Sequence, residues 1–178
     1  MEEVYTFKKP ILKGNISPII IYDIHNKKIG SVQRVYKNRF QRICDLVMNH
    51  TFVVNIKASD NSDNVVCNIN EKLGLDNLIK SKWEGTSIII GDFSVVDRTK
   101  IKTNPRVDVQ IDGEIFLKIK KDVGDKRVFF STSEDNEIVA EVSYHNPVFP
   151  RDITISLRSL NLHCLDIAAL YYIFDSRC

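Results

Sequence analysis

Residues 161–175, NLHCLDIAALYYIFD, decide the fold, because they form a helix-length segment that is apolar on nearly every side. Between Leu162 and Phe174 only His163 and Asp166 are polar, and both lie in the first turn. A surface helix has one apolar stripe, whereas a helix that is apolar all round must be enclosed by protein or lipid. Residues 162–174 would span about 20 Å as a helix, too short for a bilayer core of roughly 30 Å. The segment therefore predicts a central helix, at about residues 161–175, enclosed by the rest of a soluble fold.

Strand signals dominate the chain before this helix. The candidate strands are residues 4–8, 18–23, 29–36, 40–47, 51–58, 65–69, 86–90, 93–98, 106–111, 115–121, 127–132, 138–144 and 152–157. The clearest pair is a hairpin in which two alternating segments flank an Asp112-Gly113 turn. Only residues 71–83 interrupt the strands, and their leucine pattern predicts a short surface helix.

The number of strands limits the architecture. An eight-stranded barrel is filled by its own side chains, whereas about eleven strands can house a central helix, which is roughly 10–12 Å wide. We therefore expect a mainly β protein, a closed barrel of about twelve antiparallel strands around a buried hydrophobic C-terminal α-helix. The barrel would occupy about residues 3–158 of a single domain covering residues 1–178.

Composition indicates an ordinary globular protein with one basic region. The 178 residues are 43% hydrophobic and 27% charged, with a net charge of +2. Residues 1–50 carry nine Lys or Arg against four Asp or Glu, a local excess of cations on a nearly neutral chain. The N-terminus has no signal-peptide or myristoylation pattern, and the four cysteines have no paired spacing. These features predict free thiols and a cytoplasmic protein, which could lie peripherally at a membrane.

The order of the elements and certain residues resemble a known family. The residues are Tyr5-Thr-Phe7, the run at 18–23 continuing into 29–34, Arg151-Asp152, and the closing helix at 166–175. Together they resemble the tubby C-terminal-like superfamily, and within it the LURP-one-related branch and its small bacterial relatives. The resemblance implies a twelve-stranded barrel around a hydrophobic C-terminal helix. It also implies a link to membranes, since tubby proteins bind phosphoinositide head groups through basic side chains and the related phospholipid scramblases are membrane-associated.

The basic segment at residues 34–42, RVYKNRFQR, is the first candidate binding site. Four cations alternate there with Tyr36 and Phe40 around an expected hairpin tip, and the cations are Arg34, Lys37, Arg39 and Arg42. Arginine donates bidentate hydrogen bonds to phosphate, and aromatic side chains can wedge into a membrane interface. The alternative is that the cations are solvated positions guarding strand edges while the aromatic rings face the core.

A second candidate is the pair Lys118 and Lys120, which strand periodicity places on one face, opposite Leu117 and Ile119. An ordinary barrel exterior has the same pattern, so the alternative is again a solvated outer face. If both basic regions rimmed the same end of the barrel, they would form one cationic mouth.

Other patterns give less support to a specific chemistry. Residues 60–64 with Glu71 imitate part of a calcium loop, but Val65 stands where that loop requires glycine, so we expect a polar hairpin turn. The four histidines have no metal-ligand spacing, and no nucleophile elbow or phosphate-binding loop occurs. We interpret His163 and Asp166 as a polar patch at the barrel mouth, and Trp83 as packed on the barrel wall. We expect neither a metal nor a cofactor.

The function predicted from the sequence is a non-enzymatic binding module. Its expected ligand is an anionic membrane lipid or a phosphorylated ligand, held by the basic loops. The alternative is a protein-interaction or regulatory module without a lipid ligand. Nucleic acid is not expected as a partner, and no transmembrane segment is expected.

Overall fold

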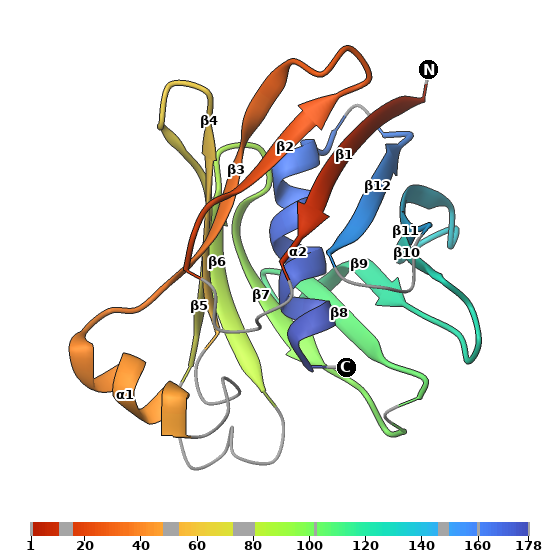
Figure 1. The fold of residues 1–178 in the computed structure, drawn as a ribbon. Helices are drawn as coiled ribbons and strands as arrows, with labels where there is room; N and C mark the ends of the chain where they lie inside the picture. The colour runs from red at the N-terminus through yellow and green to blue at the C-terminus, as the bar shows by residue number, and fades with distance from the viewer. Residues whose placement is uncertain are drawn as a thin grey trace.

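In the computed structural model, twelve strands form a closed antiparallel barrel around one helix (Figure 1). The structure describes residues 2–10, 16–47, 54–72, 81–101, 103–145, 150–159 and 161–177. The strands are β1 Glu3–Lys9, β2 Ile19–Asp23, β3 Lys28–Val35, β4 Asn55–Asp60, β5 Val65–Glu71, β6 Lys82–Ser87, β7 Gly91–Asp97, β8 Arg106–Ile111, β9 Glu114–Lys120, β10 Arg127–Thr132, β11 Ile138–Tyr144 and β12 Arg151–Leu157. The helices are α1 Arg39–Val47 and α2 Cys164–Arg177. Each strand pairs with its neighbours in the chain, and β1 pairs with β12 to close the barrel.

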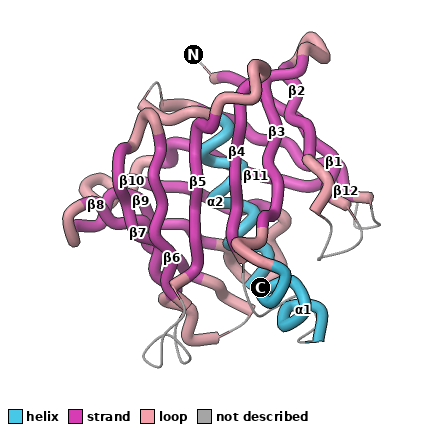
Figure 2. The backbone as a smooth tube through the Cα atoms, turned by 90° about the vertical axis from the view of Figure 1, so that its left-hand side faces the viewer, coloured by secondary structure: helices cyan, strands magenta, loops and turns pink. Residues whose placement is uncertain are grey.

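Helix α2 fills the interior, as its apolar sequence predicts. Leu165, Ile167, Ala169 and Ile173 are completely buried among inward-facing residues of the strands, and Figure 2 shows the helix running through the barrel. The wall approaches it closely at Gly30 of β3, where an added Cβ would lie 2.9 Å from a Leu165 methyl carbon and 2.3 Å from the Ser59 carbonyl oxygen. A side chain at this position would collide with both the helix and β4. The predicted fold class is confirmed.

The two ends of α2 are held by polar contacts. The Leu165 backbone N–H donates to His163 Nδ1 at 3.2 Å, so His163 caps the first turn. At the other end Asp175 forms an ion pair with Lys9 of β1. An acidic residue is unfavourable at a helix C-terminus, and this partner outside the helix accounts for its presence there.

Several local predictions are confirmed. The hairpin between β8 and β9 turns at Asp112 (φ 50°) and Gly113 (φ 88°), the left-handed pair that a tight hairpin requires. The segment at 60–64 is a polar turn between β4 and β5, in which Asp60 Oδ1 accepts the backbone N–H groups of Ser62 and Asn64. Trp83 is fully buried and donates to the Val54 carbonyl at 3.1 Å. Cys44, Cys67 and Cys164 are free thiols, while Cys178 lies outside the described residues.

Three predictions about elements need correction. Residues 40–47 are not a strand but most of helix α1. Residues 86–90 are not one strand, because β6 ends at Ser87 and a turn follows. Of the helix predicted at 71–83, Glu71 belongs to β5 and Trp83 to β6, whereas residues 73–80 lie outside the described part. Neither described helix is long and apolar enough to span a bilayer.

Candidate functional site

Helix α1 projects from the barrel wall between β3 and β4 (Figures 1 and 2). Its start is encoded by Asn38 and Gln41. The Asn38 side chain accepts the Gln41 backbone N–H at 2.8 Å, and the Gln41 side chain accepts the Lys37 backbone N–H at 2.8 Å. These reciprocal bonds satisfy amide groups that a helix N-terminus leaves unpaired, in a close variant of the capping box.

A buried ion pair holds α1 against the barrel. Of the nine residues of the helix, Asp45 is the one that is buried. Its Oδ1 accepts from Arg34 Nη2 at 2.8 Å, and its Oδ2 accepts from the Tyr36 hydroxyl at 2.6 Å. Arg34 is itself 1% exposed, and its guanidinium lies 5.5 Å from the centre of the Tyr36 ring. Burial, with the hydrogen bond to Asp45, raises the pKa of Tyr36 to about 12, so its hydroxyl stays protonated and donates at neutral pH.

The face of α1 turned away from the barrel is apolar. Phe40, Ile43, Leu46 and Val47 are between 60% and 80% exposed. Spacings of three and four residues place these side chains on one side of a helix, and Asp45 lies on the other. The apolar stripe that would normally pack on a core therefore faces solvent.

Two exposed arginines flank this apolar face. Arg39 and Arg42 line a shallow groove of about 420 Å³ between α1 and the end of β3. Gln33, Tyr36 and Asn38 also line it. Neither arginine forms an ion pair with any described residue, and Lys37, two residues before the helix, is exposed as well. The groove thus presents uncompensated positive charge beside an exposed apolar surface.

The structure separates the cations that the sequence analysis grouped. Arg39 and Arg42 lie at the α1 surface and Lys37 is exposed just before the helix, whereas Arg34, although it borders the same groove, is buried because Asp45, eleven residues later, folds back to pair with it. The expected hairpin tip is in fact the end of β3 followed by a helix. This is a correction to the proposed exposure of Arg34.

Lys118 and Lys120 do not join this groove. They lie on the outer face of β9, opposite the buried Leu117 and Ile119, as strand periodicity predicts. Strands β3 and β9 are six positions apart in the twelve-stranded ring, so the two basic regions are on opposite sides of the barrel. Lys118 Nζ lies 3.4 Å from Asn136 Oδ1. The structure contains no single basic mouth formed by both regions.

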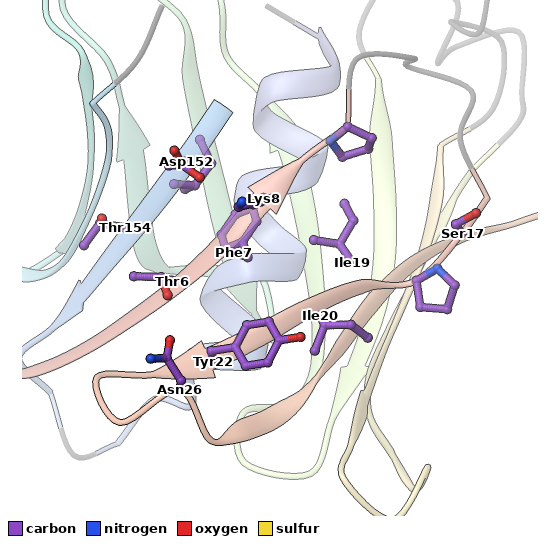
Figure 3. A pocket seen from close by; sticks show the side chains of 13 residues that line it. Thr6, Phe7, Lys8, Ser17, Ile19, Ile20, Tyr22, Asn26, Asp152 and Thr154 are labelled. Atoms are coloured by element: carbon purple, nitrogen blue, oxygen red, sulfur yellow. The ribbon is translucent and has the colours of Figure 1, made fainter. Parts of the chain in front are cut away.

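A second concavity lies on the outer wall where β1 and β2 separate (Figure 3). These strands pair only from Tyr5 to Phe7 of β1, while β1 stays paired with β12 as far as Lys9. The groove has a volume of about 550 Å³. Its charged side chains are Lys8 of β1 and Asp152 of β12, which are register partners of opposite sign. This groove therefore has no net charge, in contrast to the groove beside α1.

The apolar face of α1 is the feature that strand-based reading of the sequence missed. The Asn38-to-Gln41 capping pattern and the three-to-four spacing of Phe40, Ile43 and Val47 are both visible in the sequence. Within the described residues, no cluster of three or more His, Cys, Asp or Glu side chains could hold a metal ion.

Comparison with known proteins identifies related sequences and folds. The family model of the tubby C-terminal-like domain matches residues 5–176. The crystal structure of a LURP-one-related protein from Arabidopsis thaliana superposes with a TM-score of 0.57 at 13% sequence identity, covering 98% of this chain and 90% of that one. Among curated proteins, none matches the sequence significantly. At this identity the structural likeness shows the fold alone.

Proposed function

The chain belongs to the tubby C-terminal-like domain family, and we propose that it is a non-enzymatic module that binds anionic membrane surfaces through helix α1. Membership of the family supports a binding function in general. The single observation that carries the specific proposal is the exposed apolar face of α1 beside Arg39 and Arg42, which form no ion pair with a described residue.

The ligand must meet two chemical requirements at once. The guanidinium groups of Arg39 and Arg42 favour phosphate or carboxylate groups, which they can bind through two parallel hydrogen bonds. Phe40, Ile43 and Val47 favour an apolar environment within a few ångströms of those anions. The boundary between lipid head groups and acyl chains supplies both, whereas a small phosphorylated molecule in water supplies only the first.

The geometry of α1 suits binding in the plane of a membrane. Nine residues make a helix about 13 Å long, which can lie in the interface but not cross it. The Arg34–Asp45 pair and the Tyr36 hydroxyl fix the helix with its polar side on the barrel. Because the described core residues of α2 fill the barrel interior, we place the binding site on the outer surface.

Sedimentation with liposomes tests the proposal. Wild-type protein should sediment with phosphatidylserine-containing vesicles at low salt, less at moderate salt, and little with phosphatidylcholine vesicles. R39Q/R42Q should weaken the apparent affinity by roughly thirtyfold, since each interfacial cation contributes about 1 kcal/mol. F40S/I43S should weaken it by more than about tenfold, because both side chains lose their burial in lipid.

The controls separate the alternatives. K118Q/K120Q removes the same charge from the opposite side of the barrel and should bind like wild type. All variants should retain the wild-type melting temperature because the substituted side chains lie on the surface. If inorganic phosphate or an inositol phosphate binds and F40S/I43S binds it equally well, the ligand is a free phosphorylated molecule. If wild-type protein does not sediment with anionic vesicles, the proposal is wrong and a protein partner for the α1 face becomes the better hypothesis.

A further inference from the structure

The connection between β7 and β8 carries a second exposed apolar side chain next to a cation. Ile101 is 64% exposed, and Lys100 beside it is exposed as well. The loop is held by its own hydrogen bonds, since the Asn104 N–H donates to the Ile101 carbonyl at 2.9 Å and the Arg106 N–H donates to Thr99 Oγ1 at 3.0 Å. Ile101 is thus presented by an organised turn.

This loop and α1 belong to the same end of the barrel. Consecutive antiparallel strands place their connections alternately at two ends, so the β3–β4 and β7–β8 connections share one end, which we call the α1 end. Figure 1 shows α1 and the β7–β8 loop at the lower side of the molecule. The other end, which we call the hairpin end, carries the β2–β3, β4–β5, β6–β7, β8–β9 and β10–β11 turns.

The two ends have opposite charge. In the described connections of the α1 end, eight cations stand against three acids: Lys37, Arg39, Arg42, Lys72, Arg98, Lys100, Lys121 and Lys126 against Asp45, Asp122 and Asp125. In those of the hairpin end, two cations stand against five acids: Lys27 and Arg158 against Asp63, Asp112, Glu134, Asp135 and Glu137. An anionic surface attracts the first end and repels the second.

We propose that Lys100 and Ile101 form a second membrane contact, so that the barrel docks on an anionic bilayer with its α1 end down. The inference rests on the proposed function of α1 and adds a defined orientation to it. A single nine-residue helix would leave the barrel free to pivot about one point. A second contact four strands away around the ring prevents that rotation.

The chain offers a matched pair of variants for the test. K100Q/I101S removes one cation and one exposed isoleucine from the α1 end. I24S/K27Q removes the same two groups from the β2–β3 turn at the hairpin end, where Ile24 is 66% exposed. Binding to phosphatidylserine-containing vesicles is measured by sedimentation for wild type, both double variants and F40S/I43S. Thermal denaturation of each confirms that it is folded.

We expect K100Q/I101S to weaken binding by roughly tenfold, through the loss of one interfacial cation and one inserted isoleucine. I24S/K27Q should stay within about twofold of wild type, since a shift of this size is less than 0.5 kcal/mol. If both variants bind like wild type while F40S/I43S does not, α1 anchors the protein alone and the second contact is wrong. If I24S/K27Q loses as much as K100Q/I101S, the orientation is wrong. If wild-type protein does not bind, the proposed function itself fails.

Discussion

The two helices of this protein differ in which of their side chains are buried: α2 buries its apolar residues, whereas α1 exposes them. Helix α2 is apolar on nearly all sides and is enclosed by the strands, with Leu165 and Ile173 completely buried. Helix α1 is amphipathic, yet its apolar residues face solvent and its one buried side chain is the charged Asp45. Helix α2 is held mainly by apolar contacts, whereas α1 is held on the barrel by the buried carboxylate of Asp45.

This difference shows that an apolar stripe predicts the buried face of a helix only when no buried ion pair or hydrogen bond orients the helix the other way. Around α2 the inner wall is mostly apolar, so nearly every side of the helix gains by burial, with Asp166 as the buried charged exception. At α1 the barrel offers Arg34 and Tyr36, which select the polar side of the helix. The apolar side of α1 therefore remains exposed, and we propose that it contacts a membrane surface.

Shortening the chain to residue 159 should abolish folding. Six of the large apolar side chains buried by the lost segment are each worth about 1.5–3 kcal/mol, so together on the order of 10–15 kcal/mol gross as an upper bound. Those side chains are Leu162, Leu165, Ile167, Leu170, Ile173 and Phe174. This total is as large as the net stability of a typical domain. Circular dichroism and solubility of the shortened chain provide the measurement.

A matched pair of substitutions refines this prediction. L165S in α2 should lower the free energy of unfolding by about 2–5 kcal/mol, the range for truncating a large buried side chain. F40S in α1 should change it by less than about 0.5 kcal/mol, because the side chain is exposed. Similar effects of L165S and F40S in urea unfolding would contradict the contrast between the helices.

Breaking the buried ion pair should release α1. D45A leaves Arg34 buried without its carboxylate and should cost about 3–5 kcal/mol. The double variant R34M/D45L replaces both charges by apolar groups and should recover most of this loss. Urea unfolding measures the energies, and hydrogen exchange of the α1 backbone shows whether the helix detaches locally. If D45A retains wild-type stability and α1 protection, the ion pair does not hold the helix.

Asp166 should make stability depend on pH with a characteristic sign. This α2 residue is fully buried, and burial raises the pKa of its carboxyl, although the nearby Ser87 and Cys67 side chains oppose the shift. The folded chain therefore binds the proton of the Asp166 carboxyl more tightly than the unfolded chain does. The stability gained from this protonation is fully present below the pKa of the unfolded chain, about 3.9, and is lost as pH rises through the folded pKa.

D166N cannot ionise and should remove this dependence. At pH above the folded pKa it should be more stable than wild type by about 1 kcal/mol, a typical effect for one substitution. At low pH the difference should vanish. The ionised carboxylate is also stabilised by its position in the first turn of the helix, which reduces the gain in stability expected for D166N. The decisive measurement is therefore how the free energy of unfolding of each protein changes with pH. Parallel stability curves for wild type and D166N would exclude a role for this ionisation.

Part of the candidate site was predictable from the sequence and part was not. Exposure of Arg39 and Arg42 agrees with their expected place on a surface, and Lys118 and Lys120 lie on the outer face that strand periodicity assigns them. Helix α1 itself could have been found from the cap at Asn38. The burial of Arg34 could not, because it depends on which side of α1 the barrel covers.

The architecture follows from the amino-acid sequence alone, because an all-apolar helix of this length must be enclosed and about twelve alternating strands can enclose it. Those signals are local and periodic, so they can be read along the chain. Three properties require the folded chain: which cations share a surface, which face of α1 remains exposed, and how charge divides between the ends of the barrel. These properties depend on distances between residues far apart in the chain, which periodicity does not contain.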